Sequence, residues 1–383
     1  MAQPLRVLSL NCGMMGHVTY QNNLDKGMKR YAPDIDFRTV MMLPYPAKDW
    51  VGYWGFKLIA KHVPGVRDDR DYRRFRSELG QSLRAERVLR QEIKTFVPDV
   101  IHLHTQALAL TAIPLLARYP SVVGIDLTTA LLIQEHHRPV TYAPIVKRER
   151  SCFHAASHVL SWTEFAAKSV IADYGVPAER VSVERPFLCD LTHEPRAERK
   201  GGDVRLLFVG NDFERKGGRE LLAVWEREKW AERGACLDIV SGQLSGDEKL
   251  PAGVQLHRNL TAASGGLLAL YRDADIFVMP THEDASPMVY MEAMAAGLPS
   301  IGTAVMGVPE LVKDGVNGLT VTPKDTQSLA VAMKKLIEDA SLRKRLGEAG
   351  LARYHSEFDP RTNTRRVADI FLRVAGSSAL AHS

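Results

Sequence analysis

Short apolar runs alternate with longer segments of helical periodicity along most of the chain, and this alternation constrains the fold more than any other feature. Runs without a polar face are typical of strands buried on both sides, and such strands form parallel sheets covered by helices. The first set comprises Val7 to Leu10, Ile35 to Val40, Val100 to Leu103, Val122 to Ile125 and Val159 to Ser161. The sequence therefore predicts an α/β fold.

The alternation lapses between residues 186 and 203, which are mostly polar and include Pro195 and two adjacent glycines, as in an interdomain linker. It then restarts, with runs at Val204 to Val209, Leu237 to Val240, Val254 to His257, Ile276 to Met279 and Pro299 to Gly302. We expect two doubly wound, Rossmann-like domains, at 1–185 and 204–355, and a C-terminal helix over 356–383 that crosses back to the first domain. Because open sheets bind ligands at the carboxyl ends of their strands, two such domains would face one another across a cleft.

Composition narrows the class of protein. Hydrophobic residues make up 45% of the 383 positions and charged residues 25%, as in globular proteins that build a full core. The longest nearly apolar run, Ala107 to Ala117, is interrupted by Thr111 and Pro114 and is far shorter than the ~20 residues that span a bilayer. No cleavable leader is evident, and the four cysteines are far apart. We therefore expect a cytoplasmic chain with free thiols.

The histidines invite a metal interpretation that we consider weak. His154 and His158 could share one helical face as a two-ligand site, but no glutamate lies between them and no third ligand is evident. His102 and His104 alternate on a predicted strand and so share one face, which fits a cleft edge or a structural position equally well. We expect no metal and no cofactor.

A predicted helix near residue 290 could hold a phosphate. Ser286 is a favoured N-cap residue and Pro287 suits the first helical position. The N–H groups of Met288 and Val289 would then be free at the positive end of the helix.

Two acids flank this helix start, because Asp284 lies in the loop before it and Glu292 lies one turn inside. Acids are common near helix amino termini, so a capped surface helix with incidental acids explains the spacing equally well.

A second candidate for phosphate binding is the segment FVGNDFERKGGRELL, which passes from a strand into a loop. Its notable residues are Gly210, Arg215, Lys216, Gly217 and Gly218. Adjacent cations beside glycines allow side chains and backbone to approach a diphosphate together, and arginine adds a planar fork to the point charge of lysine. The Walker spacing is absent, and taken alone the loop is better explained as a solvated turn.

Together these features closely resemble glycosyltransferase family four, the retaining transferases of GT-B fold that use nucleotide sugars. The resemblance covers nearly the whole chain. Its motifs are the Gly-rich turn Asn11 to His17, the strand DVIHLH at Asp99 to His104, Ser161, the turn Gly175 to Pro177, the loop with Lys216 and Gly217, and two acids separated by seven residues before Ala-Met-Ala.

The resemblance implies roles for particular residues. It implies that Arg215 and Lys216 bind the donor diphosphate, that Glu292 holds the nucleotide ribose, and that the first acid contacts the transferred sugar. Alignment on Glu292 places Asp284 at the first acidic position, with Glu283 one residue out of register, so we prefer Asp284. The implied donor set is completed by Gly210, Arg258, Ser286, Pro287, Met288 and Val289, and the implied acceptor side comprises Gly13, Gly16, His17 and Asp126.

The sequence departs from the family pattern at three places. Asp126 stands where the family has its acceptor-side histidine, and Arg258 stands where a glycine often lies near the base. Residues 186–190 replace the usual sequence after the Gly-Val-Pro turn. These departures affect the acceptor contacts more than the donor contacts.

The resulting hypothesis is a retaining glycosyltransferase that moves a sugar from a nucleoside diphosphate donor to an acceptor hydroxyl. Arg215, Lys216 and the helix start at Met288 are expected to stabilise the negative charge that develops on the departing diphosphate. Two rivals remain open: a nucleotide-sugar epimerase of the same fold, and a subunit that keeps the fold without activity.

The net charge of +5 arises in one segment, because residues 57–94 contain 11 basic and 6 acidic residues. Just before this segment, the aromatic residues Trp50, Tyr53, Trp54 and Phe56 are interleaved with Lys48, Lys57 and Lys61. Aromatic residues suit the lipid interface and clustered cations favour an anionic leaflet, although a packed core with a solvated basic face is a simpler account. We predict peripheral contact with an anionic membrane, a glycan or lipid-linked acceptor, and no nucleic-acid partner.

Overall fold

The computed structural model describes residues 3–14, 16–43, 57–67, 70–136, 140–191, 202–244, 248–260 and 265–381. The chain divides into two compact units. The first contains residues Met1–Cys189 and Pro360–Ser383, and the second contains Asp190–Asp359. Phe187 and Leu188 are buried, so the first unit extends beyond the expected start of the linker, most of which lies outside the described residues.

The first unit is built on a six-stranded parallel sheet of order β2-β1-β3-β4-β5-β6. Its strands are β1 (Leu5–Asn11), β2 (Ile35–Met41), β3 (Val100–His104), β4 (Ser121–Ile125), β5 (His158–Ser161) and β6 (Val181–Val183). The strand order reverses between β1 and β3, so the carboxyl ends of these two strands form the switch point where ligands bind in open α/β sheets.

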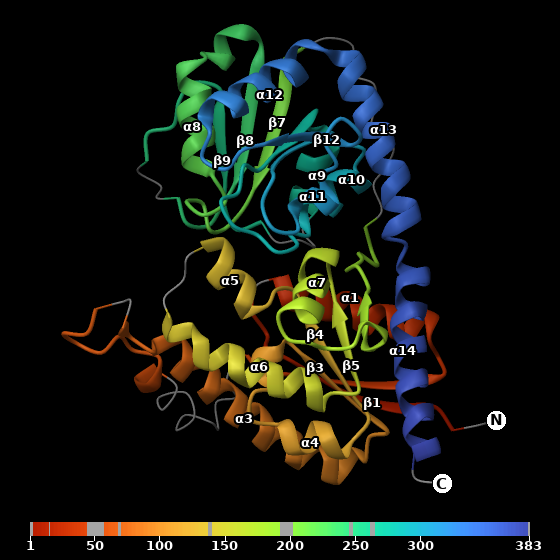
Figure 1. Cartoon of the computed structure of the whole chain (residues 1–383). Coiled ribbons are helices and arrows are strands. Elements are labelled where there is room, and N and C mark those ends of the chain that lie inside the picture. The colour runs from red at the N-terminus through yellow and green to blue at the C-terminus, as the bar shows by residue number, and fades with distance from the viewer. Residues whose placement is uncertain are drawn as a thin grey trace. The chain divides into compact units, whose positions relative to one another are not determined.

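Helices cover both faces of this sheet (Figure 1). They are α1 (Gly16–Tyr31), α3 (Arg73–Phe96), α4 (Ile113–Arg118), α5 (Thr129–His136), α6 (Ala143–Ala155), α7 (Glu164–Ala172) and α14 (Pro360–Ala381), with short 3-10 helices η2 (Gln106–Leu108), η3 (Val140–Tyr142) and η4 (Ala178–Arg180). The alternation of side chains along β3 separates the two faces. Ile101 and Leu103 join the apolar core that includes Leu89 of α3 and Phe153 of α6, whereas His102 faces α14.

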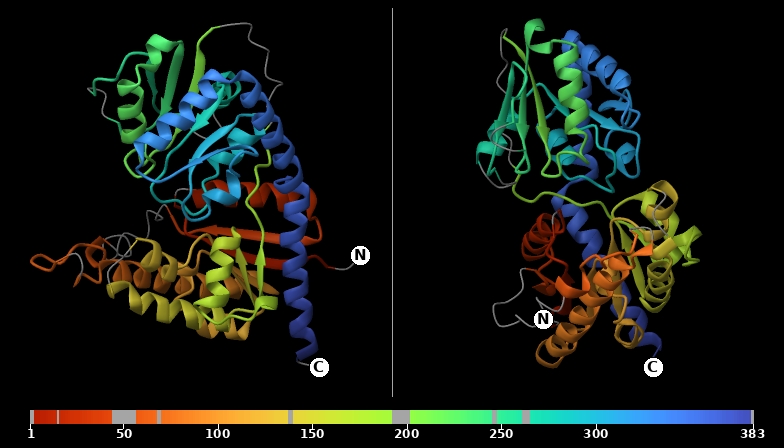
Figure 2. Two further views of the ribbon diagram at one scale, coloured as in Figure 1. Left: turned by 45° about the horizontal axis from the view of Figure 1, so that its top comes forward. Right: turned by 90° about the vertical axis from the view of Figure 1, so that its left-hand side faces the viewer.

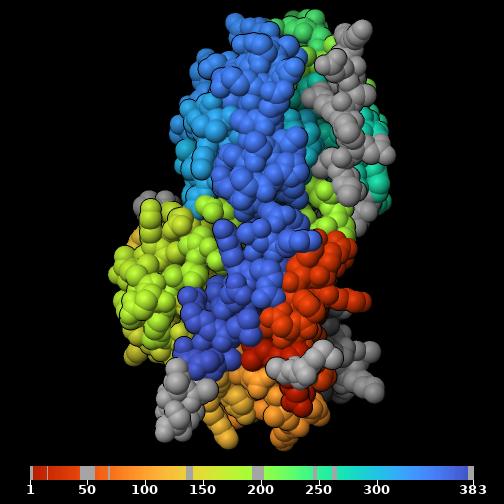
Figure 3. Space-filling view, turned by 90° about the vertical axis from the view of Figure 1, so that its right-hand side faces the viewer, coloured from red at the N-terminus to blue at the C-terminus, as the bar shows by residue number. Residues whose placement is uncertain are grey.

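The last helix, α14, is part of the first unit although it lies at the end of the chain. Arg365 forms an ion pair with Asp34, 2.5 Å between Nη1 and Oδ1, and Phe371 stacks on Phe37. The surface of α14 runs between the N-terminal elements, in red, and the yellow-green segment near residue 180 (Figure 3). The helix therefore ties the carboxyl end of the chain to its first strands.

The second unit repeats the architecture with a six-stranded parallel sheet of order β12-β11-β10-β7-β8-β9. Its strands are β7 (Val204–Val209), β8 (Ala235–Val240), β9 (Val254–His257), β10 (Ile276–Val278), β11 (Ser300–Thr303) and β12 (Gly318–Val321). Its helices are α8 (Gly218–Arg227), η5 (Trp230–Arg233), α9 (Gly265–Asp273), α10 (Val289–Ala295), α11 (Val308–Leu311), α12 (Thr326–Glu338) and α13 (Ala340–Glu357). Helix α8 packs against α12, and α10 packs against α13 (Figure 2). The strand order reverses between β7 and β10.

The predicted α/β class and the two Rossmann-like sheets are confirmed. The apolar runs did not predict β6 and β12, the strands at one edge of each sheet. Both strands are short, and β6 is only half-buried along its length. Ser182 interrupts β6 and Thr320 interrupts β12, so neither segment forms an apolar run that is recognisable in the sequence.

Candidate functional site

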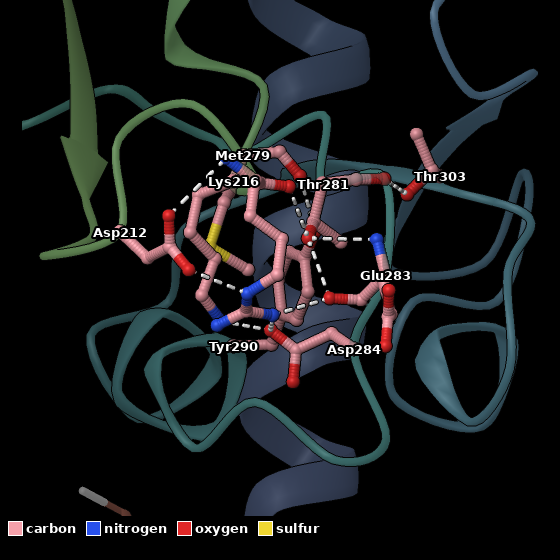
Figure 4. Close-up of polar contacts among 9 residues, drawn as sticks. Asp212, Lys216, Met279, Thr281, Glu283, Asp284, Tyr290 and Thr303 are labelled. Carbon is pink, nitrogen blue, oxygen red and sulfur yellow. Dashed lines mark hydrogen bonds and ion pairs between the residues drawn. The ribbon is translucent and has the colours of Figure 1, made fainter. Parts of the chain in front are cut away.

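In the second unit, the loops that follow β7 and β10 meet because these two strands are neighbours at the switch point. The carbonyl oxygen of Arg215 in the first loop accepts a hydrogen bond from the backbone N–H of His282, 2.8 Å away, and another from the hydroxyl of Thr281 at 3.2 Å. Figure 4 shows the side chains that converge where the loops touch. Two segments separated by some seventy residues are therefore fixed against one another.

The two predicted diphosphate ligands both make ion pairs at this junction. Lys216 pairs with the carboxylate of Asp284, and both side chains are largely buried. Arg215 Nε lies 2.8 Å from Oδ2 of Asp212, and its Nη1 donates to the carbonyl oxygen of Glu283 at 2.5 Å. The same Nη1 is 3.9 Å from Asp284 Oδ2. The structure thus brings together Arg215, Lys216 and Asp284, which lie far apart in the sequence.

Three glycines make this approach possible. Gly217 has a φ of +77°, and a Cβ there would overlap the carbonyl oxygen of Pro280. A Cβ on Gly218 would overlap the ring of Phe213. A Cβ on Gly210 would lie 3.1 Å from Cγ of Lys216, so this glycine leaves room for the lysine stem. The backbone N–H groups of Gly217 and Gly218 already donate to carbonyl oxygens of the same loop. An anion at this loop would therefore be bound by the side chains of the loop.

Electrostatics set the charge of this cluster. Burial lowers the pKa of Lys216, and the positive charge of Arg215 lowers it further. The ion pair with Asp284 acts in the opposite direction, because it favours the protonated ammonium. An anion placed beside Lys216 would also favour the charged form.

The second acid of the motif, Glu292, lies on α10 and is only 5% exposed. Its Oε2 accepts a hydrogen bond of 2.7 Å from the hydroxyl of Tyr271, and within the described chain no other side chain donates to it. Burial raises the pKa of this carboxyl to about 7. Glu292 is therefore a buried acid with one oxygen occupied and one open to a further donor.

The helix that carries Glu292 begins later than predicted. Helix α10 starts at Val289 with Met288 at the N-cap position, so the expected N-cap at Ser286 and first helical residue at Pro287 are wrong. The backbone of Met288 is already helical, with φ −61° and ψ −22°, and it makes no side-chain cap. The donor-binding roles of the four residues from Ser286 to Val289 stay predictions.

Arg258 follows β9 and is exposed. Its guanidinium donates to the carbonyl oxygen of Leu244, in the connection between β8 and β9. This contact lies at the carboxyl ends of β8 and β9. The role of Arg258 near the nucleotide base stays a prediction.

The predicted acceptor-side residues come together at the switch point of the first unit. His17 Nδ1 lies 3.1 Å from Nε2 of His104, and its Nε2 lies 3.6 Å from Oδ2 of Asp126. Gly13 has a φ of +75° and packs against the backbone of Leu43, whereas a Cβ on Gly16 would point into open space. The structure therefore places His17 beside Asp126, a direct contact between two residues of the implied acceptor side that the sequence did not predict.

The rings around His104 fix this arrangement. The ring centroids of Tyr20 and Trp162 lie 4.7 Å and 5.0 Å from that of His104, and both rings stack on it. Burial lowers the pKa of His104 well below its ordinary value. His104 is therefore neutral and presents a fixed ring to His17.

The metal interpretation of His154 and His158 is wrong in its geometry. His154 lies on α6, which ends at Ala155, and His158 begins β5, so the two share no helical face. His154 contacts the carbonyl oxygen of Tyr174 at 2.9 Å, and His158 contacts the hydroxyl of Ser182 at 2.8 Å. Among the residues that the structure describes, no group of three or more His, Cys, Asp or Glu side chains could hold a metal ion. In the same residues, no helix has the length and apolar character of a bilayer span.

Two family models match the two units of the chain. "Glycosyltransferase Family 4" matches residues 51–185, and "Glycosyl transferases group 1" matches residues 203–339. The chain belongs to glycosyltransferase family four.

Relatives of known activity agree with this family. The chain is 27% identical to a glycogen synthase of Mycobacterium tuberculosis over 73% of this chain and 70% of that protein. It is also 27% identical to a D-inositol 3-phosphate glycosyltransferase of Pseudarthrobacter chlorophenolicus, over 52% of this chain and 51% of that protein. The chain thus spans about half the length of this second relative.

Solved structures share the fold at low sequence identity. Sucrose-phosphate synthase from Thermosynechococcus elongatus is 16% identical, with a TM-score of 0.73 and coverage of 98% of this chain and 100% of that one. The Anabaena protein HepE, solved in complex with UDP-glucose, is 18% identical, with a TM-score of 0.66 and coverage of 95% and 98%. These likenesses establish the GT-B fold of this family four member.

The family motifs did not reveal several residues that hold the site. Asp212 positions Arg215 and precedes it by three residues, a spacing that could have suggested the contact. Tyr271 holds Glu292, and the hydroxyl of Thr303 donates to the carbonyl oxygen of Thr281 at 2.6 Å. Tyr290 donates to the carbonyl oxygen of Met279 at 2.6 Å. Apart from Asp212, these partners are distant in sequence, so no local pattern marks them.

Proposed function

We propose that this family four glycosyltransferase moves a hexose from a nucleoside diphosphate sugar to an acceptor hydroxyl with retention of anomeric configuration. The observation that carries the proposal is the convergence of Arg215 and Lys216 with Asp284 at the switch point of the second unit. Two cations side by side at the carboxyl ends of the strands suit a diphosphate, which has several oxygens and two negative charges to share.

The charges explain how the site would assist the reaction. As the anomeric bond breaks, the sugar gains oxocarbenium character and the departing diphosphate gains negative charge. Arg215 and Lys216 would stabilise that charge from fixed positions, because Asp212 and the Glu283 carbonyl hold the guanidinium and Gly210 accommodates the lysine stem. The departing phosphate could itself accept the proton of the acceptor hydroxyl, so this step requires no base from the second unit.

Glu292 has the geometry expected of a ribose ligand. Tyr271 occupies one carboxylate oxygen, and the other is open to a hydroxyl donor. Burial strengthens such a hydrogen bond because little water competes for it. A ribose diol that donates to Glu292 would also favour its ionised form.

On the acceptor side we propose that Asp126 and His17 bind the incoming hydroxyl group. Asp126 stands in place of the family histidine. The imidazole of His17 lies beside it, with 3.6 Å between Nε2 of His17 and Oδ2 of Asp126. The stacked His104 keeps that ring in place.

We also propose a membrane contact and an acceptor that is a glycan or is lipid-linked, in glycan or glycolipid biosynthesis. The aromatic residues Trp50, Tyr53, Trp54 and Phe56 lie outside the described residues. Just after them, Leu58, Ile59 and Val63 are exposed apolar side chains beside the exposed Lys57 and Lys61. Apolar side chains next to cations suit an anionic lipid surface.

Vesicle cosedimentation tests this contact. Two arginines of residues 57–94 are poor choices for substitution, because Arg74 pairs with Glu78 and Arg76 pairs with Asp71 within the protein. We expect salt-sensitive binding to phosphatidylserine vesicles that is lost when Leu58 and Ile59 become Ser. No binding at low salt would favour a soluble acceptor.

The central experiment is a thermal-shift screen of nucleoside diphosphates and their sugars, followed by assays of transfer and hydrolysis with the best ligand. We expect one base to stabilise the protein, and Lys216→Ala to reduce that shift without abolishing it, because Arg215 remains. Tight binding with neither transfer nor hydrolysis would support an inactive subunit, and donor isomerisation without an acceptor would support an epimerase.

A further inference from the structure

Both cations of the donor loop are neutralised by acids of the same unit, but to different degrees. Lys216 and Asp284 are 15% and 13% exposed, so their ion pair is largely shielded from solvent. Arg215 and Asp212 are 32% and 43% exposed, so theirs is closer to a surface pair. The lysine pair is therefore the stronger obstacle to a competing anion.

A diphosphate and the carboxylate of Asp284 repel each other if both contact the ammonium of Lys216. The carboxylate oxygen that contacts the ammonium is also 3.9 Å from Arg215 Nη1, so it lies between the two cations that a diphosphate would bridge. Like charges at such a distance repel strongly where solvent is excluded. The carboxylate has to move away from Lys216 when the diphosphate arrives.

We propose that Asp284 is an internal competitor of the nucleoside diphosphate for Lys216. The inference rests on the proposed function. The carboxylate weakens binding of the free nucleoside diphosphate, which is the product, and once displaced it can accept hydrogen bonds from the hydroxyls of a sugar donor. The same side chain thus favours release of the product and retention of the complete donor.

Titration calorimetry with UDP, GDP and ADP on the full chain tests the proposal. Removal of the competing charge in Asp284→Asn is expected to tighten binding of the preferred nucleoside diphosphate about tenfold, equivalent to about 1.4 kcal/mol. The matching sugar nucleotide should gain less, because Asn offers a weaker acceptor to the sugar. Asp284→Ser provides a second neutral variant if the Asn side chain disturbs the fold.

Two controls separate the specific pair from general charge. Glu283→Gln removes a negative charge one residue away, and we expect it to tighten binding by less than about threefold, because Asp284 is the residue that pairs with Lys216. In a Lys216→Met background, Asp284→Asn is expected to give no gain, because the competition needs the ammonium.

The outcomes distinguish this inference from the proposed function. Wild-type binding with no gain in either neutral variant, or with an equal gain in Glu283→Gln, would overturn the competition alone. A gain that persists without Lys216 would also overturn it. If neither wild type nor variants bind any of the three nucleotides, the donor site and the competition both fail.

Discussion

Among the residues that the structure describes, one glutamate in each unit is buried near the carboxyl edge of the sheet, and the two acids differ in how many donors surround them. Glu149 in the first unit accepts from the N–H and hydroxyl of Thr129 at 3.1 Å and 2.7 Å, from Gln106 at 3.2 Å, and from the hydroxyl of Tyr174. Glu292 in the second unit accepts from Tyr271 alone among the described side chains. Burial raises the pKa of both carboxyls to about 7.

The difference indicates that burial and a raised pKa do not by themselves mark a functional acid. Glu149 is saturated by internal donors and fixes the start of α5 to α6, which is a structural role. Glu292 keeps an open oxygen, which is what a ligand site requires. The predictions below test whether ligand binding and stability divide between the units in this way.

The largest expected effect is on turnover in the second unit. Lys216→Ala and Arg215→Ala should each lower the rate about 100- to 1000-fold, because each removes a preorganised charge from the departing diphosphate. Steady-state kinetics with the donor found by screening measures this. Arg227→Ala, an exposed arginine of α8, serves as the matched control and should stay near wild type. Wild-type rates in both loop variants would rule out this donor site.

Removal of the saturated acid should affect stability. Glu149→Ala leaves the donors around it without an acceptor and is expected to lower the free energy of unfolding by about 3 kcal/mol. Urea unfolding measures the change, with Glu179→Ala, an exposed glutamate of the same unit, as the control. Nucleotide affinity at 25 °C should remain unchanged, and a variant that lost affinity while keeping its stability would break the comparison.

The open acid should show the reverse pattern. Glu292→Gln is expected to weaken binding of the free nucleoside diphosphate about tenfold, in the range of a hydrogen bond to a charged group, with a smaller effect on unfolding. Asp284→Asn should mainly impair sugar transfer. If Glu283→Gln proved damaging and Asp284→Asn harmless, the register of the first acid would be wrong by one residue.

The smallest effect is a pH dependence. Both carboxyls have a folded pKa raised from the ordinary 4.5 to about 7, so the folded chain binds more protons than the unfolded chain between these values. Each acid therefore contributes stability below pH 4.5 that is lost as the pH rises through 7. Unfolding at pH 5 and pH 8 should show Glu149→Gln and Glu292→Gln losing less stability than wild type. Saturating nucleotide should reduce only the Glu292 contribution, and equal slopes in all three proteins would contradict both assignments.

The sequence predicted the fold better than the geometry of the site. Apolar runs identified ten of the twelve strands, including the edge strands β2 and β9. They missed β6 and β12, because these segments are only three and four residues long and are interrupted by Ser182 and Thr320. The donor motif pointed to Arg215, Lys216 and Asp284, which the structure brings together. It did not reveal Asp212, Tyr271 or the pairing of His17 with Asp126, and it placed the start of α10 too early.

The sequence by itself determined what depends on local periodicity and local charge: the α/β class, the two Rossmann-like halves, and a loop with adjacent cations beside glycines. Only the tertiary structure decided which groups meet. Because β7 and β10 are neighbours in the sheet, Lys216 finds its counter-ion on the second loop, some seventy residues away. Because β1, β3 and β4 are adjacent, His17 lies between His104 and Asp126. Such contacts are set by the order of strands in a sheet, which no short window of sequence contains.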